Sequence, residues 1–75
     1  MGRKMFRRKA EEVLKASGGE WLGGSEVMYR TNQKLPGYAS CNVGAISHFM
    51  RVLKARGCIE IRKCGKYLEY RWIGE

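Results

Sequence analysis

The sequence has no aspartate, only one histidine and no apolar run longer than a few residues. Because no nucleophile, base and orienting group can be assembled from such an inventory, we expect the protein not to be an enzyme. No stretch is long enough to cross a membrane. No apolar segment follows the basic residues 1–9, as a secretory signal requires. These absences favour a small binding protein.

Cysteine is also scarce. The three cysteines are an odd number and form no Cys-x-x-Cys motif. This argues against a disulfide framework and favours a reducing, cytoplasmic compartment. A zinc site built from Cys41, His48, Cys58 and Cys64 is the alternative, but the spacing of these residues matches no zinc knuckle. We therefore expect no metal and no cofactor, with Cys58 as a small buried residue and Cys64 in a turn.

What the chain has in excess is positive charge. Its 75 residues carry 15 Lys and Arg against 7 acids, giving a net charge of +8 and a pI near 9.8. The length fits one domain, residues 1–75, and leaves little room for a large catalytic cavity. Such a basic domain favours a polyanionic partner, nucleic acid first and an anionic membrane surface second. Solubility alone is the remaining explanation for the charge.

The first half of the chain predicts a helix, a short strand, a second helix and a loop, over residues 3–17, 20–22, 26–33 and 34–40. Ser25 is a suitable N-cap for the second helix, with Glu26 in its first turn. Pro36 disfavours helix at Leu35, which places the loop there.

The clearest helix spans residues 43–56. An apolar stripe with helical spacing is formed by Val43, Ile46, Phe49, Met50 and Leu53. Ser40 or Asn42 can cap its start, and Gly57 ends it. The opposite face is small, polar and basic, and consists of Gly44, Ser47, His48, Arg51 and Ala55. Small residues leave room for another molecule to approach closely.

The C-terminal part alternates between apolar and polar residues and predicts a β-hairpin with a basic tip. If its loop centres on Cys64-Gly65, Ile61 lies opposite Leu68 and Glu60 lies opposite Glu69. The two like charges would then destabilise the strand pair mildly. By their spacing, five aromatic residues are expected in the core: Phe6, Trp21, Phe49, Tyr70 and Trp72.

Three helices packed on a small sheet cover these apolar faces, so the expected class is α+β. The order of elements resembles the winged helix-turn-helix family of DNA-binding domains over nearly the whole chain. The stretch from Ala45 to Ile59 looks like the recognition helix of that family running through Leu53-x-x-x-Gly57 into the wing. Residues 25–28, Ser-Glu-Val-Met, resemble the start of its second helix. The resemblance implies three helices, a C-terminal hairpin wing and a short strand between the first two helices.

Two features depart from the family pattern. The loop over residues 34–40 is longer than the usual tight turn between the second and third helices. Members specialised for left-handed DNA have Asn and Tyr where this chain has Ser47 and Arg51, so that specialisation is not expected here.

The resemblance and the charge together predict sequence-specific binding of double-stranded DNA by a small transcription regulator. Helix 43–56 would enter the major groove, and the wing over residues 62–66 would lie on the adjacent backbone. The expected base-contacting residues are Asn42, Gly44, Ala45, Ser47, His48 and Arg51. The expected phosphate-contacting residues are Arg3, Lys4, Arg7, Arg8, Arg30, Lys34, Lys54, Arg62, Lys63 and Lys66.

Other interpretations of these residues remain open at this point. Arg51 and His48 are also typical of an ordinary solvated helix face, and Tyr29 and Tyr38 are expected to pack rather than touch phosphate. A winged-helix module that binds an acidic protein around Leu35 and Tyr38, or one that binds structured RNA, is the alternative function. The expected partner is therefore double-stranded DNA, with no membrane, and a homodimer is left open because palindromic DNA sites mirror two-fold symmetry.

Overall fold

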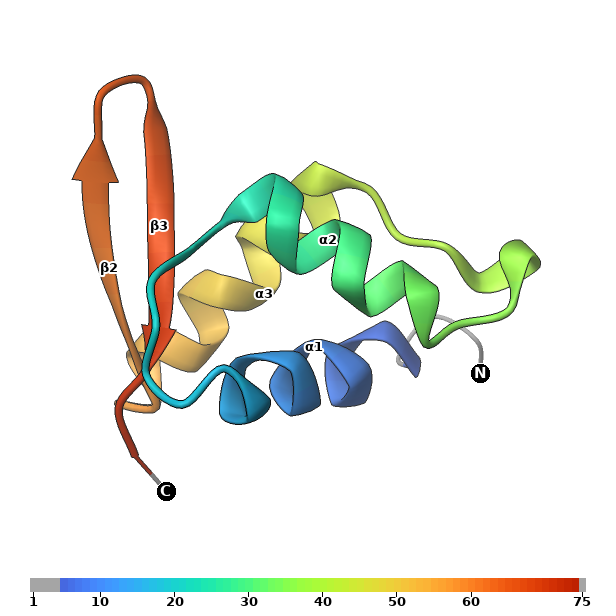
Figure 1. Ribbon diagram of the computed structural model, residues 1–75, viewed down its shortest axis with the longest axis horizontal. Coiled ribbons are helices and arrows are strands. Elements are labelled where there is room, and N and C mark those ends of the chain that lie inside the picture. The colour runs from blue at the N-terminus through green and yellow to red at the C-terminus, as the bar shows by residue number, and fades with distance from the viewer. Residues whose placement is uncertain (1–4, 75) are drawn as a thin grey trace.

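The computed structural model describes residues 5–74, which form three α-helices and a three-stranded antiparallel sheet (Figure 1). The predicted α+β class is confirmed. The elements are α1 (Met5–Ala16), β1 (Leu22–Gly23), α2 (Gly24–Gln33), the 3-10 turn η2 (Gly37–Ala39), α3 (Val43–Ala55), β2 (Ile59–Cys64) and β3 (Tyr67–Trp72). Arg3 and Lys4, two of the expected phosphate contacts, lie outside the described residues.

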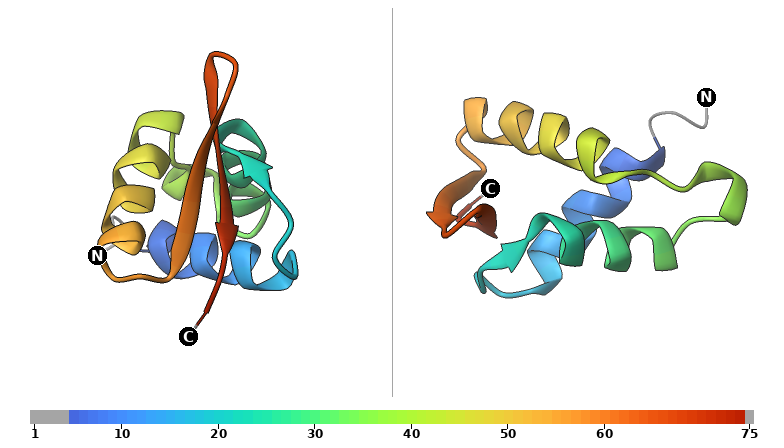
Figure 2. Two further views of the ribbon diagram at one scale, coloured as in Figure 1. Left: turned by 90° about the vertical axis from the view of Figure 1, so that its left-hand side faces the viewer. Right: turned by 90° about the horizontal axis from the view of Figure 1, so that it is seen from above.

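The sheet stands at one end of the helical layer, and the β2–β3 hairpin projects beyond it (Figures 1 and 2). Helix α2 packs against α1 and against α3, and α3 also contacts β2. No helix within residues 5–74 has the length and apolar character needed to span a membrane.

Helix α2 begins earlier than the sequence predicts. Gly23 is its N-cap, with extended backbone at φ −73° and ψ 163°, and no side chain caps the helix. The expectation that Ser25 is the cap is therefore wrong. The physical reason is that Gly23 is still paired with Glu69 in the sheet, so the strand passes directly into the helix.

The segment between α2 and α3 is tied down by one side chain. The Asn32 amide donates to the carbonyl oxygen of Cys41 at 3.0 Å and accepts from the Cys41 backbone N–H at 2.9 Å. The predicted loop thus contains the turn η2 and is closed by an amide that bonds both backbone groups of one residue. This pair of hydrogen bonds fixes where α3 starts relative to α2.

Helix α3 begins where the sequence predicts and ends one residue earlier than predicted. The Asn42 side chain accepts from the Ala45 backbone N–H at 2.7 Å, which is an N-cap, and Gly57 follows the helix with φ +78°. The structure ends the helix at Ala55. One inward assignment is wrong, because Val43 is 42% exposed. Val43 is the first residue of α3 and lies at the edge of its buried face.

The hairpin register differs from the expected one by two residues. Ile61 pairs with Tyr70 and Glu60 with Arg71, so the anticipated Glu60–Glu69 clash does not occur. The two-residue turn is Gly65-Lys66, and Gly65 has φ +64°. Glycine at the first central position is what a type II′ turn requires, so the turn sets the register. Cys64 consequently lies in the strand and not in the turn.

The core lies between the helices and the inner face of the sheet. Its largest fully buried side chains include Leu14, Ile46, Met50 and Leu53. Phe49 and Tyr70 are buried as predicted, and Phe6 packs edge-on against Phe49 with ring centroids 5.9 Å apart. These contacts hold α3 against α1.

Trp21 is not a core residue. Leu22 faces inward and is 5% exposed, and neighbouring residues of an extended chain face opposite sides, so Trp21 lies on the outer face of the sheet. The assignment of Trp21 to the core is therefore wrong.

Candidate nucleic-acid interface

The outer face of α3 is polar, basic and free of acidic side chains. Gly44, His48 and Arg51 are exposed, whereas Ala45 and Ser47 are half-buried at its two edges. Within the described part of the chain, Arg51 has no acidic side chain within 4.0 Å, so its guanidinium remains available to an external acceptor. Asn42 is exposed, but its amide oxygen already accepts the cap bond, which leaves only its NH₂ group to donate.

The three cations near the hairpin tip divide between two faces. Lys63 pairs with Leu68 and shares the inner, helix-facing side with Ile61. Arg62 points to the opposite side. Lys66 lies in the turn itself. Lys63 and Lys66 have no acidic partner among residues 5–74, so the tip presents two free ammonium groups on or near the side that faces α3.

Arg62 is engaged by the molecule itself. Its guanidinium bonds the Glu69 carboxylate at 2.7 Å and lies 4.4 Å from the centre of the Trp21 ring. Arg71 stacks on the same ring at 4.8 Å and bonds Glu60 at 2.7 Å. These contacts join all three strands on the outer face of the sheet. Arg62 therefore fastens the hairpin to Trp21, whereas Lys63 and Lys66 have no ion-pair partner among residues 5–74.

A groove runs between the start of α3 and the hairpin. Val43 and Ser47 line it from α3, and Lys66, Tyr67 and Leu68 line it from the hairpin. The first turn of α2 and the Tyr70 side chain close its floor, and its volume is about 270 Å³. Ser47 of the sequence-predicted helix face and Lys66 of the predicted basic tip therefore line one common concavity, although they are far apart in the chain.

No acidic residue lines this groove, although Glu26 and Glu69 line a hollow that adjoins it at Gly24, Ser25 and Tyr67. Residues 27–59, which include all of α3, contain no Asp or Glu. The acids of the sheet and of α2, namely Glu26, Glu60 and Glu69, are each paired with an arginine. Arg51, Lys54, Lys63 and Lys66 form no ion pair within residues 5–74, whereas the neighbouring Glu26 and Glu69 are each paired with an arginine, so we expect a net positive potential along the groove.

The other expected phosphate contacts are distributed differently. Arg30 pairs with Glu26, and Lys34 lies beside the cleft between α1 and the far end of α2. Arg7 lies over the Phe49 ring at 5.2 Å, and Arg8 is exposed on α1. The structure thus brings Ser47 of the α3 face and Lys66 to one groove, but it does not bring Arg30 or Lys34 there.

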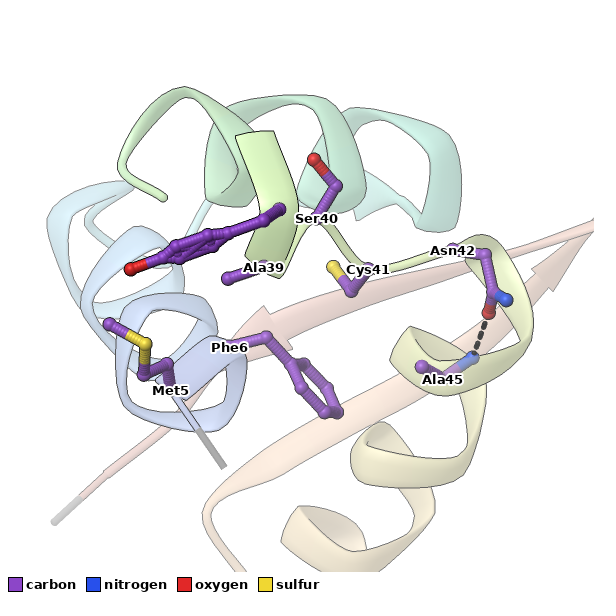
Figure 3. A pocket seen from close by; sticks show the side chains of 8 residues that line it. Met5, Phe6, Ala39, Ser40, Cys41, Asn42 and Ala45 are labelled. Carbon is purple, nitrogen blue, oxygen red and sulfur yellow. Dashed lines mark hydrogen bonds between the residues drawn. The ribbon is translucent and has the colours of Figure 1, made fainter. Parts of the chain in front are cut away.

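A second concavity lies beside the first turn of α3. Met5 and Phe6 of α1, residues 38–41 and the cap region of α3 enclose about 580 Å³ (Figure 3). The Cys41 thiol lies in its wall and contacts the Asn32 amide oxygen at 3.3 Å. Burial raises the pKa of the Cys41 thiol, and its backbone hydrogen bond offsets part of this effect.

The site residue that sequence reasoning missed is Val43. Its 3.6-residue spacing from the core positions matched burial, so periodicity alone gave the wrong answer. Leu35, named as a possible protein-docking residue, is only 9% exposed, whereas Tyr38 is 84% exposed.

In residues 5–74, no three of His, Cys, Asp and Glu gather as a metal site would require, and the three cysteines are free. Comparison with protein-family models, curated proteins and solved structures finds no match for this chain. The groove is therefore interpreted from its own geometry.

Proposed function

We propose that this protein is a winged-helix domain that binds double-stranded DNA, with α3 in the major groove and the tip of the β2–β3 hairpin on the adjacent backbone. The order of three helices followed by an antiparallel hairpin is compatible with that fold. The proposed role is that of a small, sequence-specific transcription regulator.

One observation carries the proposal. Ser47 of the acid-free α3 face and Lys66 of the hairpin tip line the same groove, and Lys63 lies on the strand face that is turned towards the helices. Major-groove binding needs an exposed helix with donors for base edges, and phosphate anchoring needs cations beside that helix. Ser47, His48 and Arg51 supply the donors, and Lys63 and Lys66 supply the cations.

Mobility shifts on duplex DNA test the proposal. We expect binding at about 50 mM salt that weakens steeply towards about 200 mM, because phosphate contacts release counterions. Arg51→Ala combined with Lys63→Ala should weaken binding further, while Lys9→Ala combined with Lys15→Ala serves as a control of equal charge loss. Absence of binding at the lower salt, or equal effects of the two double variants, contradicts the proposal.

Competition distinguishes DNA from RNA as the partner. A helix of this width enters the major groove of B-form DNA but not the deep, narrow major groove of A-form RNA. We therefore expect unlabelled duplex DNA to displace the bound probe at lower concentration than duplex RNA of the same sequence. Stronger displacement by RNA would replace DNA with RNA in the proposal.

A further inference from the structure

Three exposed apolar side chains surround the groove between α3 and the hairpin. Val43 is 42% exposed, Tyr67 is 73% exposed and Leu68 is 41% exposed, and all three line the same concavity. Single exposed apolar residues need no explanation, but three around one hollow form a surface that is typical of recognition.

The stability of the helix does not explain why a valine stands at position 43. Valine is a poor helix former because its branched side chain loses rotamer freedom, and at this position 42% of its surface stays exposed. It stands in the first turn of α3, directly after the Asn42 cap. In helices that enter the major groove, the N-terminal residues are the ones that reach base edges.

The chemistry of the groove indicates what occupies it. Its lining contains no acid, and its polar side-chain groups are the Lys66 ammonium, the hydroxyls of Ser25 and Ser47 and the phenol groups of Tyr67 and Tyr70. The occupant therefore carries negative charge together with a small apolar group. In the major groove of duplex DNA, the only apolar group on a base edge is the C5 methyl of thymine.

We propose that Val43 is a specificity-determining residue that contacts a thymine methyl, with Tyr67 and Leu68 walling the groove on the hairpin side. This inference rests on the proposed DNA binding and goes further by naming the base. It also gives a physical reason for preferring DNA to RNA, because uracil lacks this methyl group.

Replacement of thymine by deoxyuridine isolates the methyl group. The probe is a duplex selected from a random library by binding to the full chain, then synthesised once with thymine and once with deoxyuridine. We expect wild-type affinity to fall about fourfold for each contacted methyl, as burial of one such group predicts. Val43→Ala should bind both duplexes equally, at about the wild-type affinity for the deoxyuridine duplex.

Ile73→Ala is the matched control, because Ile73 is 48% exposed and does not line the groove. This variant should retain the full wild-type difference between the two duplexes. Equal wild-type binding to both duplexes, an undiminished difference in Val43→Ala, or a selected sequence without thymine overturns the thymine assignment while leaving DNA binding intact. Failure to select any duplex overturns the proposed function as well.

Discussion

Thr31 offers a quantitative test of the packing between the helices. Its side chain is fully buried in α2, and its hydroxyl oxygen has no hydrogen-bond partner among residues 5–74. An unsatisfied buried polar group costs about 1–3 kcal/mol. Valine has nearly the same shape and a similar helix propensity, so Thr31→Val removes this penalty without opening a cavity.

We expect Thr31→Val to raise the free energy of unfolding by about 1 kcal/mol, the lower end of that range. For a domain of this size the corresponding rise in Tm is about 4–8 °C. Urea and thermal denaturation followed by circular dichroism measure both quantities. DNA affinity should not change, because the Thr31 side chain is 0% exposed.

Val27→Thr is the reverse substitution at a position that is also fully buried in α2. It introduces a hydroxyl into the core and should destabilise the protein by about 1–3 kcal/mol. Destabilisation by Thr31→Val of similar size would refute the reasoning, since it would show that the Thr31 hydroxyl is hydrogen-bonded in solution.

Three further substitutions or reactions test the segment that positions α3. Asn32→Ala removes both hydrogen bonds between the Asn32 side chain and the Cys41 backbone, and it should lower the free energy of unfolding by about 2 kcal/mol in urea titrations. No change would show that these two hydrogen bonds contribute nothing to stability. Asn42→Ala should cost about 1 kcal/mol while Asn42→Asp retains the cap, and equal losses in both variants would contradict this role. Iodoacetamide should alkylate exposed Cys64 before Cys41, whose pKa is raised by burial, so that less reactive thiolate is present at a given pH. Mass spectrometry of the digested protein gives the order, and faster labelling of Cys41 would be inconsistent with its burial.

The sequence predicts the helices because their signals are local. The apolar spacing in residues 43–56, the Asn42 cap and the terminating Gly57 each act within one or two turns, and all three appear in the structure. The polar, basic face of α3 follows from the same spacing, so most of its exposed residues could be named in advance.

The errors concern choices that local patterns leave undecided. A two-residue shift of the hairpin keeps every side chain on the same face, so alternation cannot separate the two registers, and only the position of Gly65 in the turn decides between them. Trp21 and Leu22 are adjacent and both apolar, so only contact with the rest of the sheet selects Leu22 for the core. The pairing of Arg62 with Glu69, and of Arg71 with Glu60, follows from the same register.

The central claim is that the hairpin-tip lysines contact DNA phosphates. The most direct measurement is the dependence of duplex affinity on salt for Lys63→Gln combined with Lys66→Gln, against Lys9→Gln combined with Lys15→Gln. Each phosphate contact contributes about 0.9 to the slope of log K against log salt. Loss of two contacts in the first pair of variants should therefore reduce this slope by about 1.8, and the control pair should leave it unchanged. A wild-type slope in the first pair, or an equal reduction in both, would contradict the account.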